Sequence, residues 1–203
     1  MLSNWGKGMK KRFLAIILLL ALTGCAGKDI DEGVSVLEEI QATSHEKTVP
    51  AEAYEYISLS YTIPDGFIRN DELSTEDADY YYSKDQGDYS YIMYSKKERD
   101  ESKDYKNLTQ SDYQAALNLS LGTSCTIEQF NMSEDDNGCL HVLFTAGYSD
   151  DHSTFKVREH CFITNRYVFQ MVYGMDQSFN KMQAVLKSEE SLQLESLASL
   201  NEK

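Results

Sequence analysis

Histidine is the residue type in this chain best suited to act as a base or a metal ligand near neutral pH. No two histidines have the spacing of a zinc-binding motif, so neither a metal site nor a cofactor is expected. The four are His45, His141, His152 and His160. If segments 139–147 and 154–164 pair as a hairpin, His141 comes close to His160. Two histidines on a solvated strand face are more often ordinary surface residues than ligands. The alternative is a hydrolase site formed by His141, His160 and Glu159.

Three cysteines lie in the second half of the chain, so at most one disulfide can form among them. An antiparallel register in which paired positions sum to 300 would place Cys139 opposite Cys161 and leave Cys125 alone. A slip of one residue would put the two sulfurs on opposite faces of the sheet. The alternative is that all three are small buried residues with free thiols.

Tyrosines gather around one predicted hairpin, and they are the most unusual local feature of the sequence. Tyrosine offers a flat apolar ring and a hydroxyl at low entropic cost, which suits a recognition surface. We therefore consider Tyr80, Tyr82, Tyr89 and Tyr91 as an interaction surface. The competing interpretation is that aromatic cross-strand pairs stabilise the hairpin itself.

Motifs of the common enzyme classes are missing from the sequence. It contains no Gly-x-Ser-x-Gly and no phosphate-binding glycine loop. The acidic turn 133–138 resembles half of a calcium loop, but Phe144 stands where the bidentate Glu is needed. We predict a hairpin turn there, in which Asn137 and Gly138 adopt positive φ. A binding role is therefore favoured over catalysis.

The chain opens with the pattern of an export signal. Three basic residues, Lys10 to Arg12, precede a ten-residue apolar run, Phe13–Leu22. A membrane span needs roughly 20 apolar residues, so the run is too short to be one. The run ends in Leu22-Thr23-Gly24-Cys25, and Met9 offers a second possible start directly before the basic residues.

This ending resembles the cleavage box of bacterial prolipoproteins at all four positions. The resemblance implies that Cys25 is acylated and becomes the mature N-terminus. Two acyl chains suffice for stable anchoring, at about 0.8 kcal/mol per buried methylene. The expected location is the extracytoplasmic face of the cell membrane.

Four segments are expected. Residues 1–24 are the signal peptide, 25–52 the lipid anchor and tether, 53–187 one domain, and 188–203 a C-terminal tail or helix extension. Removing the leader leaves 15 basic against 33 acidic residues, a formal charge of −18. So acidic a chain argues against nucleic acid as a partner and against flat docking on anionic lipid.

Period-two alternation predicts strands, and three- and four-residue spacing predicts helices. Ile57–Ile63 alternates, and 79–83 with 89–94 is typical of a hairpin. A helix should begin near Ser111 and end at Gly122. Four further strands are predicted at 123–131, 139–147, 154–164 and 166–174, and a last helix after Asp176 or Ser178. The expected fold is α+β, a single antiparallel sheet of six to seven strands with helices packed on it.

This layout resembles the PsbP-like α/β/α sandwich over about residues 54–187. The residues that carry the likeness are Ile63-Pro64-Asp65-Gly66-Phe67, the helix around Tyr113, and the pair of strands from Phe162 to Tyr173 followed by a helix. Phe67 replaces a tryptophan common in that family. The resemblance implies a binding or assembly role, with a protein partner that the sequence does not identify. The alternatives are an extracytoplasmic hydrolase and a small-molecule or metal-binding lipoprotein.

Overall fold

The structure, a computed structural model, describes residues 55–196. The predicted leader, the anchor Cys25 and the tether lie outside the described residues. Within residues 55–196, no helix is both long enough and apolar enough to cross a membrane. The elements, in chain order, are β1 (Tyr56–Ser60), β2 (Phe67–Arg69), β3 (Ala78–Ser83), β4 (Tyr91–Glu98), the 3₁₀ turn η3 (Tyr105–Asn107), α2 (Gln110–Leu121), β5 (Cys125–Glu134), β6 (Leu140–Ser149), β7 (Thr154–Ile163), β8 (Tyr167–Asp176), α3 (Met182–Glu189) and β9 (Gln193–Ser196).

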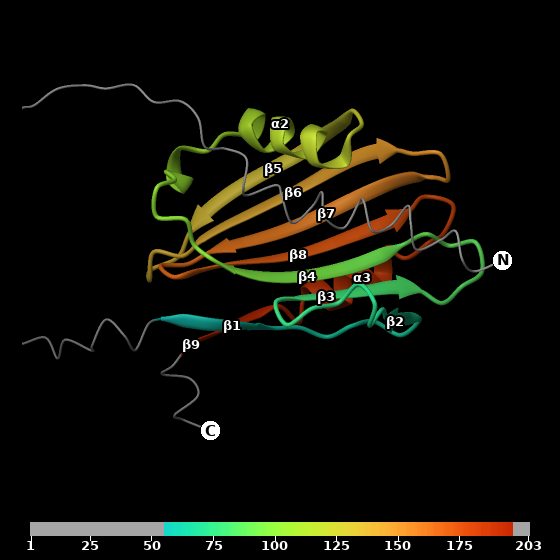
Figure 1. Cartoon of the computed structure of the whole chain (residues 1–203), viewed down its shortest axis with the longest axis horizontal. Coiled ribbons are helices and arrows are strands. Elements are labelled where there is room, and N and C mark those ends of the chain that lie inside the picture. The colour runs from blue at the N-terminus through green and yellow to red at the C-terminus, as the bar shows by residue number, and fades with distance from the viewer. Residues whose placement is uncertain (1–54, 197–203) are drawn as a thin grey trace, which may run out of the picture.

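A seven-stranded antiparallel sheet forms the centre of the domain, with strand order β2-β3-β4-β8-β7-β6-β5 (Figure 1). The chain leaves β4 in the middle of the sheet, crosses one face through α2, and returns as the edge strand β5. The hairpin of β3 and β4 and the four-strand meander from β5 to β8 confirm the sequence prediction. β2 was not predicted, because three residues are too few for a period-two pattern.

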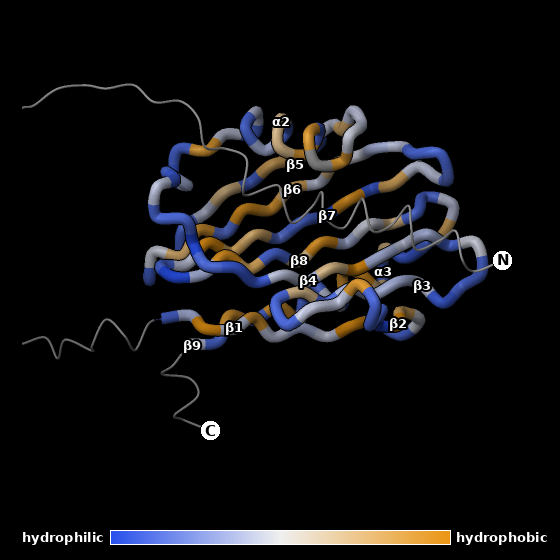
Figure 2. Tube along the Cα trace, viewed as in Figure 1, coloured by the Kyte–Doolittle hydropathy of each residue, from blue (hydrophilic) through white to orange (hydrophobic). Residues whose placement is uncertain are grey.

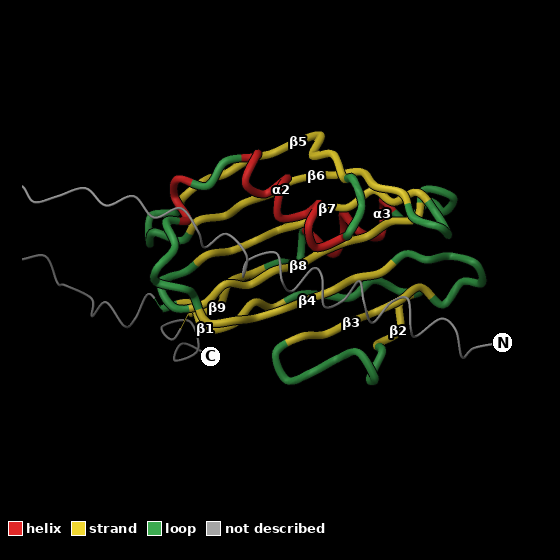
Figure 3. Tube along the Cα trace, turned by 45° about the horizontal axis from the view of Figure 1, so that its top comes forward, coloured by secondary structure: helices red, strands yellow, loops and turns green. Residues whose placement is uncertain are grey.

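Both faces of the sheet are covered, which gives the domain two cores. α2 lies over the face that we call the α2 face, where Tyr113, Ala116 and Leu117 pack on the sheet. α3 lies over the opposite face, the α3 face, where Val185 packs with Phe169 and other apolar side chains. Figure 3, turned from Figure 1, shows α2 in front of the strands and α3 behind them. The strand β8, buried along its whole length after Tyr167, is shared by both cores.

Alternation along each strand sends residues to both cores. In β7, Phe155, Val157 and Cys161 belong to the core under α2, while Lys156, Arg158 and His160 have the opposite parity. Hydrophobic colouring in Figure 2 concentrates on the strands, and the hydrophilic residues gather at the connections at both ends of the sheet. The period-two rule therefore assigned the faces of β7 correctly, although the polar face of this strand is partly buried as well.

α2 begins two residues earlier than the spacing at Ser111 predicted. Thr109 is the N-cap and forms a capping box with Asp112, which takes the place of the usual Glu or Gln. The helix ends as predicted at Gly122, which adopts φ +64°, a conformation that favours glycine. The last helix also differs from its prediction, since its N-cap is Lys181 instead of Asp176 or Ser178.

A separate two-stranded sheet corrects two predictions. β1 does not join the main sheet but pairs antiparallel with β9, so the domain has two sheets rather than one. β9 lies in the segment 188–203 that was expected to be a tail or a helix extension. The leucines there have helical spacing, but α3 stops at Glu189 and Leu194 pairs with Leu59 as a strand residue. The small sheet packs on the α3 face through Leu59.

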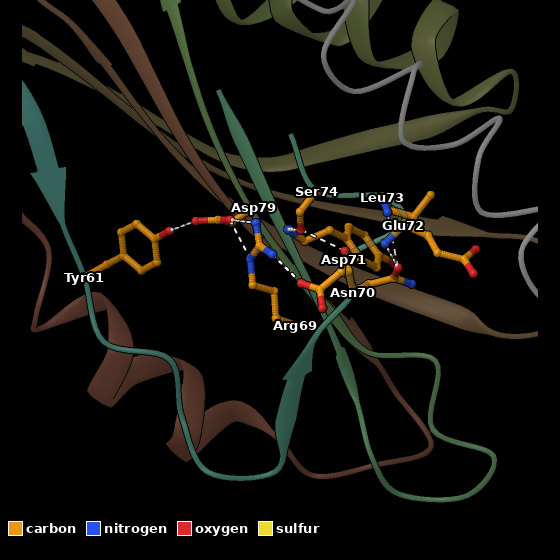
Figure 4. A network of polar contacts seen from close by, with 9 residues as sticks. Tyr61, Arg69, Asn70, Asp71, Glu72, Leu73, Ser74 and Asp79 are labelled. Carbon is orange, nitrogen blue, oxygen red and sulfur yellow. Dashed lines mark hydrogen bonds and ion pairs between the residues drawn. The ribbon is translucent and has the colours of Figure 1, made fainter. Parts of the chain in front are cut away.

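A polar network ties the chain before β2 to the main sheet (Figure 4). Asp79 on β3 accepts a hydrogen bond of 2.7 Å from the Tyr61 hydroxyl and one of 2.9 Å from Nε of Arg69 on β2. Arg69 also pairs with Asp71 in the following turn. Asn70 closes that turn by accepting from the backbone N–H of Leu73. Arg69 and Asp71 are exposed, while Tyr61, Asn70 and Asp79 are partly buried, and we assign the network a role in positioning β2.

Candidate functional site

The outer edge of β5 is closed over its first half by side chains of α2. The side-chain Oδ1 of Asn118 accepts from the backbone N–H of Cys125. The side chain of Gln114 accepts from the N–H of Ile127 and donates to the carbonyl of Cys125. Gln110 donates to the carbonyl of Ile127 at 3.3 Å. These amides stand at positions i, i+4 and i+8 of one helix face and act in place of a neighbouring strand.

The second half of the same edge is open. Cys125 and Ile127 direct their backbone groups outward, and a bulge follows between Ile127 and Gln129. Because hydrogen-bonding direction alternates along an antiparallel strand, the backbone groups that point away from β6 after the bulge are those of Phe130, Met132 and Glu134. Within residues 55–196 these outward groups form no backbone hydrogen bond. We call them the open edge.

Negative charge surrounds the open edge. Glu128 and Glu134 have side chains 46% and 41% exposed, and Asp135 and Asp136 follow in the exposed turn. Lys156 pairs with Glu128 at 3.1 Å and Lys106 with Glu134 at 2.6 Å. The four carboxylates outnumber the two lysines, so the surroundings of the open edge carry net negative charge.

An open strand edge can accept another extended segment by β-strand addition. The outward N–H and C=O groups give the affinity, and side chains at alternate positions give the selectivity. The signal in the sequence that could have located this site is the spacing of Gln110, Gln114 and Asn118, which marks the part of β5 that the helix covers. Sequence reasoning missed it because it searched for reactive residues.

The tyrosine-rich hairpin packs on the core under α2, and two of the four tyrosines predicted as an interaction surface are buried. Tyr80 and Tyr91 are only 5% and 8% exposed, and their rings stack at 6.0 Å. Tyr82 and Tyr89 are partly buried and pack against the same core. The aromatic cross-strand interpretation therefore accounts for the cluster.

The predicted disulfide between Cys139 and Cys161 is absent, and its register is wrong. Paired positions of β6 and β7 sum to 303, so Cys161 lies opposite Val142. Cys125, Cys139 and Cys161 are all free and buried. Burial raises the pKa of Cys125 to about 11 and of Cys139 to about 12, which keeps these thiols protonated and unreactive.

The two strand histidines do come together, but without Glu159. Nε2 of His141 lies 3.1 Å from Nδ1 of His160 on the α3 face. Glu159 has the opposite parity on β7 and is buried in the core under α2. The carboxylate beside the pair is Glu189 of α3, whose Oε1 lies 3.5 Å from Nε2 of His160. Sequence reasoning missed Glu189 because it is far away along the chain.

The surroundings set the charge of this cluster. Arg158 holds Glu189 through Nε at 2.5 Å and a second nitrogen at 2.9 Å. Burial alone would raise the pKa of Glu189, but the contacts with His160 and Arg158 outweigh it and bring the pKa below its ordinary value. Burial, together with His160, lowers the pKa of His141 to about 4, so His141 is neutral at pH 7.

The cluster can hold a proton or a ligand, but no nucleophile contacts it. Ser133 lies opposite His141 across the β5–β6 ladder, and within residues 55–196 no hydroxyl or thiol hydrogen-bonds to His141. The described part of the chain also holds no group of three or more His, Cys, Asp or Glu residues arranged for a metal ion. The hydrolase hypothesis therefore gains a base and a carboxylate but no reacting group.

A second polar group lies in the core under α2. Glu159, 1% exposed, accepts a hydrogen bond of 2.8 Å from Gln170, and its Oε2 has no partner. The hydroxyl of Tyr113 is also enclosed and unpartnered. Burial raises the pKa of Glu159 to about 7, although Gln170 and Lys97 act in the opposite direction. A carboxyl group that titrates near neutrality in a core makes stability depend on pH.

One cavity of about 380 Å³ lies between the 62–65 turn and α3. Its charged lining residues are Asp65 and Lys187, of opposite sign, and Ile63 and Pro64 supply apolar surface. It includes neither the histidine pair nor the open edge.

Comparison with known proteins supports the fold. No protein-family model matches the chain, and no curated protein matches it. The chain is similar in structure to the cyanobacterial PsbP protein CyanoP from Synechocystis sp. PCC 6803, with a TM-score of 0.50 and 8% identity over 75% of this chain and 98% of that one. The fold is therefore PsbP-like, as the sequence predicted.

Two other solved structures are more distant. A protein from Bacteroides thetaiotaomicron VPI-5482 has a TM-score of 0.43 and 8% identity, covering 68% of this chain and 46% of that one. A protein of unknown function from Pseudomonas aeruginosa has a TM-score of 0.40 and 10% identity, covering 71% and 88%.

Proposed function

We propose that this chain is a membrane-anchored lipoprotein of the extracytoplasmic face whose domain acts by binding a partner. The anchor is the acylated sulfur of Cys25, and the support for it is the sequence Leu22-Thr23-Gly24-Cys25 after a basic and apolar leader. The domain contributes the open edge on β5, and this single observation carries the binding role.

The partner that fits the open edge is an extended segment with basic residues at alternate positions. Its backbone would pair with Phe130, Met132 and Glu134, and its cations would face the carboxylates around the edge. Its apolar residues would lie beside Phe130 and Met132, which pack partly against the core under α2.

A second copy of this chain fits less well. Antiparallel pairing of two β5 strands about Met132 would place Glu128 of one copy opposite Asp136 of the other. Like charges that face each other across a strand pair are destabilising. We therefore expect the domain to be monomeric, and a concentration-dependent dimer that uses this edge would contradict the proposed partner.

The edge is tested by one substitution and its matched control. Proline at position 134 removes an outward N–H and blocks a docking strand, without removing a bond to β6. Glu134→Ala removes the same carboxylate and keeps the N–H. The probe is a synthetic ten-residue peptide of alternating lysine and valine, and a glutamate–valine peptide serves as the charge control.

Full-length protein and the Ala variant should bind the lysine peptide, and Glu134→Pro should lose most of that binding. Equal binding of both peptides, or equal binding by Glu134→Pro and Glu134→Ala, would contradict strand addition at this edge. The anchor is tested separately, because Cys25→Ala should abolish incorporation of labelled palmitate and release the protein from membranes. Retention in the membrane fraction by that variant would refute anchoring through Cys25.

A further inference from the structure

The rings of His141 and His160 are arranged edge to edge. Their planes differ by 19° and their centroids are 5.2 Å apart, while the facing nitrogens are separated by only 3.1 Å. The ring of His141 also lies flat on Phe162, with centroids 4.3 Å apart. Phe162 therefore supports one face of the His141 ring.

The hydrogen bonds around His160 leave one of its nitrogens available. Its Nε2 is enclosed, and Oε1 of Glu189 lies 3.5 Å from it. A proton on Nε2 would face this carboxylate, which leaves the lone pair of Nδ1 directed at His141. Metal-binding histidines commonly show this arrangement, in which a carboxylate fixes the tautomer and raises the basicity of the other nitrogen.

Glu189 is itself held in position. Arg158 binds both of its oxygens and also donates to Thr145 at 3.3 Å. The Arg158 and Glu189 charges cancel, so the histidine pair lies beside a neutral ion pair in a strongly acidic protein. A cation that binds between the rings therefore meets no uncompensated positive charge from these neighbours.

We infer that His141 and His160 form a binding site for a divalent transition metal ion of the zinc type. Nitrogens that each lie about 2.0 to 2.1 Å from a tetrahedral Zn²⁺ are about 3.4 Å apart, so the two rings need to separate by only about 0.3 Å. At these distances the ion lies about 1.1 Å to one side of the line between the two nitrogens, so the rings also turn to direct their lone pairs at it. It replaces the hydrogen bond between them. Water completes its coordination, because His141 is partly exposed.

Two protein ligands make this a weaker and more exchangeable site than a closed structural zinc site, which has four. Metal binding displaces the proton of the hydrogen bond between the two rings, so the affinity should fall at low pH. The site is on the α3 face and shares no residue with the open edge. The metal-binding inference and the strand-addition proposal can therefore be refuted separately.

The test is calorimetric titration of the full-length protein with Zn²⁺, with Co²⁺ absorption as a second readout. The informative variants are His141→Gln and His160→Gln. The matched control is His152→Gln, which changes a loop histidine that stacks on Tyr89. His45→Gln controls for the histidine outside the described residues.

Wild type and both controls should bind one Zn²⁺ and gain thermal stability from it. His141→Gln and His160→Gln should lose this binding, and Glu189→Gln should weaken it by about 10-fold to 100-fold. Equal affinity in wild type and His141→Gln, or no saturable uptake by wild type, would overturn the inference. Because His141 is partly exposed, its variant keeps the test valid even if His160→Gln unfolds the protein.

Discussion

Replacing Glu159 with glutamine should stabilise the domain at neutral and higher pH. Glu159 is buried, and only one of its oxygens has a hydrogen-bond partner. Burial raises its pKa from 4.5 to about 7 in the folded protein. The folded state therefore holds a proton that the unfolded chain releases between these pH values.

The sign and the size of the effect follow from this difference. Below about pH 4.5 the group is protonated in both states and contributes no penalty. As the pH rises from about 4.5 to about 7, the folded state loses stability relative to the unfolded state, and above that range the loss is constant. Each pKa unit corresponds to about 1.4 kcal/mol, so the full loss is about 3 kcal/mol.

The assay is urea unfolding of wild type and Glu159→Gln from pH 4 to pH 8.5. The two proteins should have similar stability near pH 4, and the variant should be more stable by up to about 3 kcal/mol at pH 8. Burial lowers the pKa of Lys97 to about 8, and its charge favours the ionised form of Glu159. Lys97→Met should therefore enlarge the difference. A difference that does not change with pH, or a variant less stable than wild type at pH 8, would refute the reasoning.

Three further predictions concern packing, helix capping and thiols. Gly174→Ala should destabilise the domain by about 1 to 3 kcal/mol in urea unfolding, because a Cβ there would lie 2.1 Å from the Tyr91 ring; an unchanged midpoint would show that the ring can move away. Thr109→Ala should cost about 1 kcal/mol by removing the capping box of α2, and a loss no greater than that of Ser111→Ala in the same assay would contradict this. The three buried cysteines should react with a thiol reagent only after unfolding, and intact mass without reductant should show no disulfide among them; a mass two units lower would contradict the free thiols.

Strand identity was predictable because it depends on local alternation. Phe155, Val157 and Cys161 share a face in the sequence pattern, and they share a core in the structure. Register was not predictable, because it depends on the geometry of the connection between β6 and β7. A sum of 303 instead of 300 separates Cys139 from Cys161.

The burial of the polar face of β7 under α3 could not be predicted either. Arg158 and His160 share the polar face of the strand, which alternation alone assigns to solvent, but α3 packs over them and supplies Glu189. That contact joins residues about thirty positions apart and depends on how α3 packs. β9 escaped prediction for a similar reason, since its leucines fit a helical pattern and only pairing with β1 makes them a strand.

Hydrogen exchange of single amides in β5 tests the open edge most directly. In the free full-length protein, the amides of Phe130 and Met132 should exchange fast, while those of Asn131 and Ser133, which point to β6, should be protected. Adding the lysine–valine peptide should slow exchange at Phe130 and Met132. Protection of these two amides in the free protein, or no change when the peptide binds, would contradict the account.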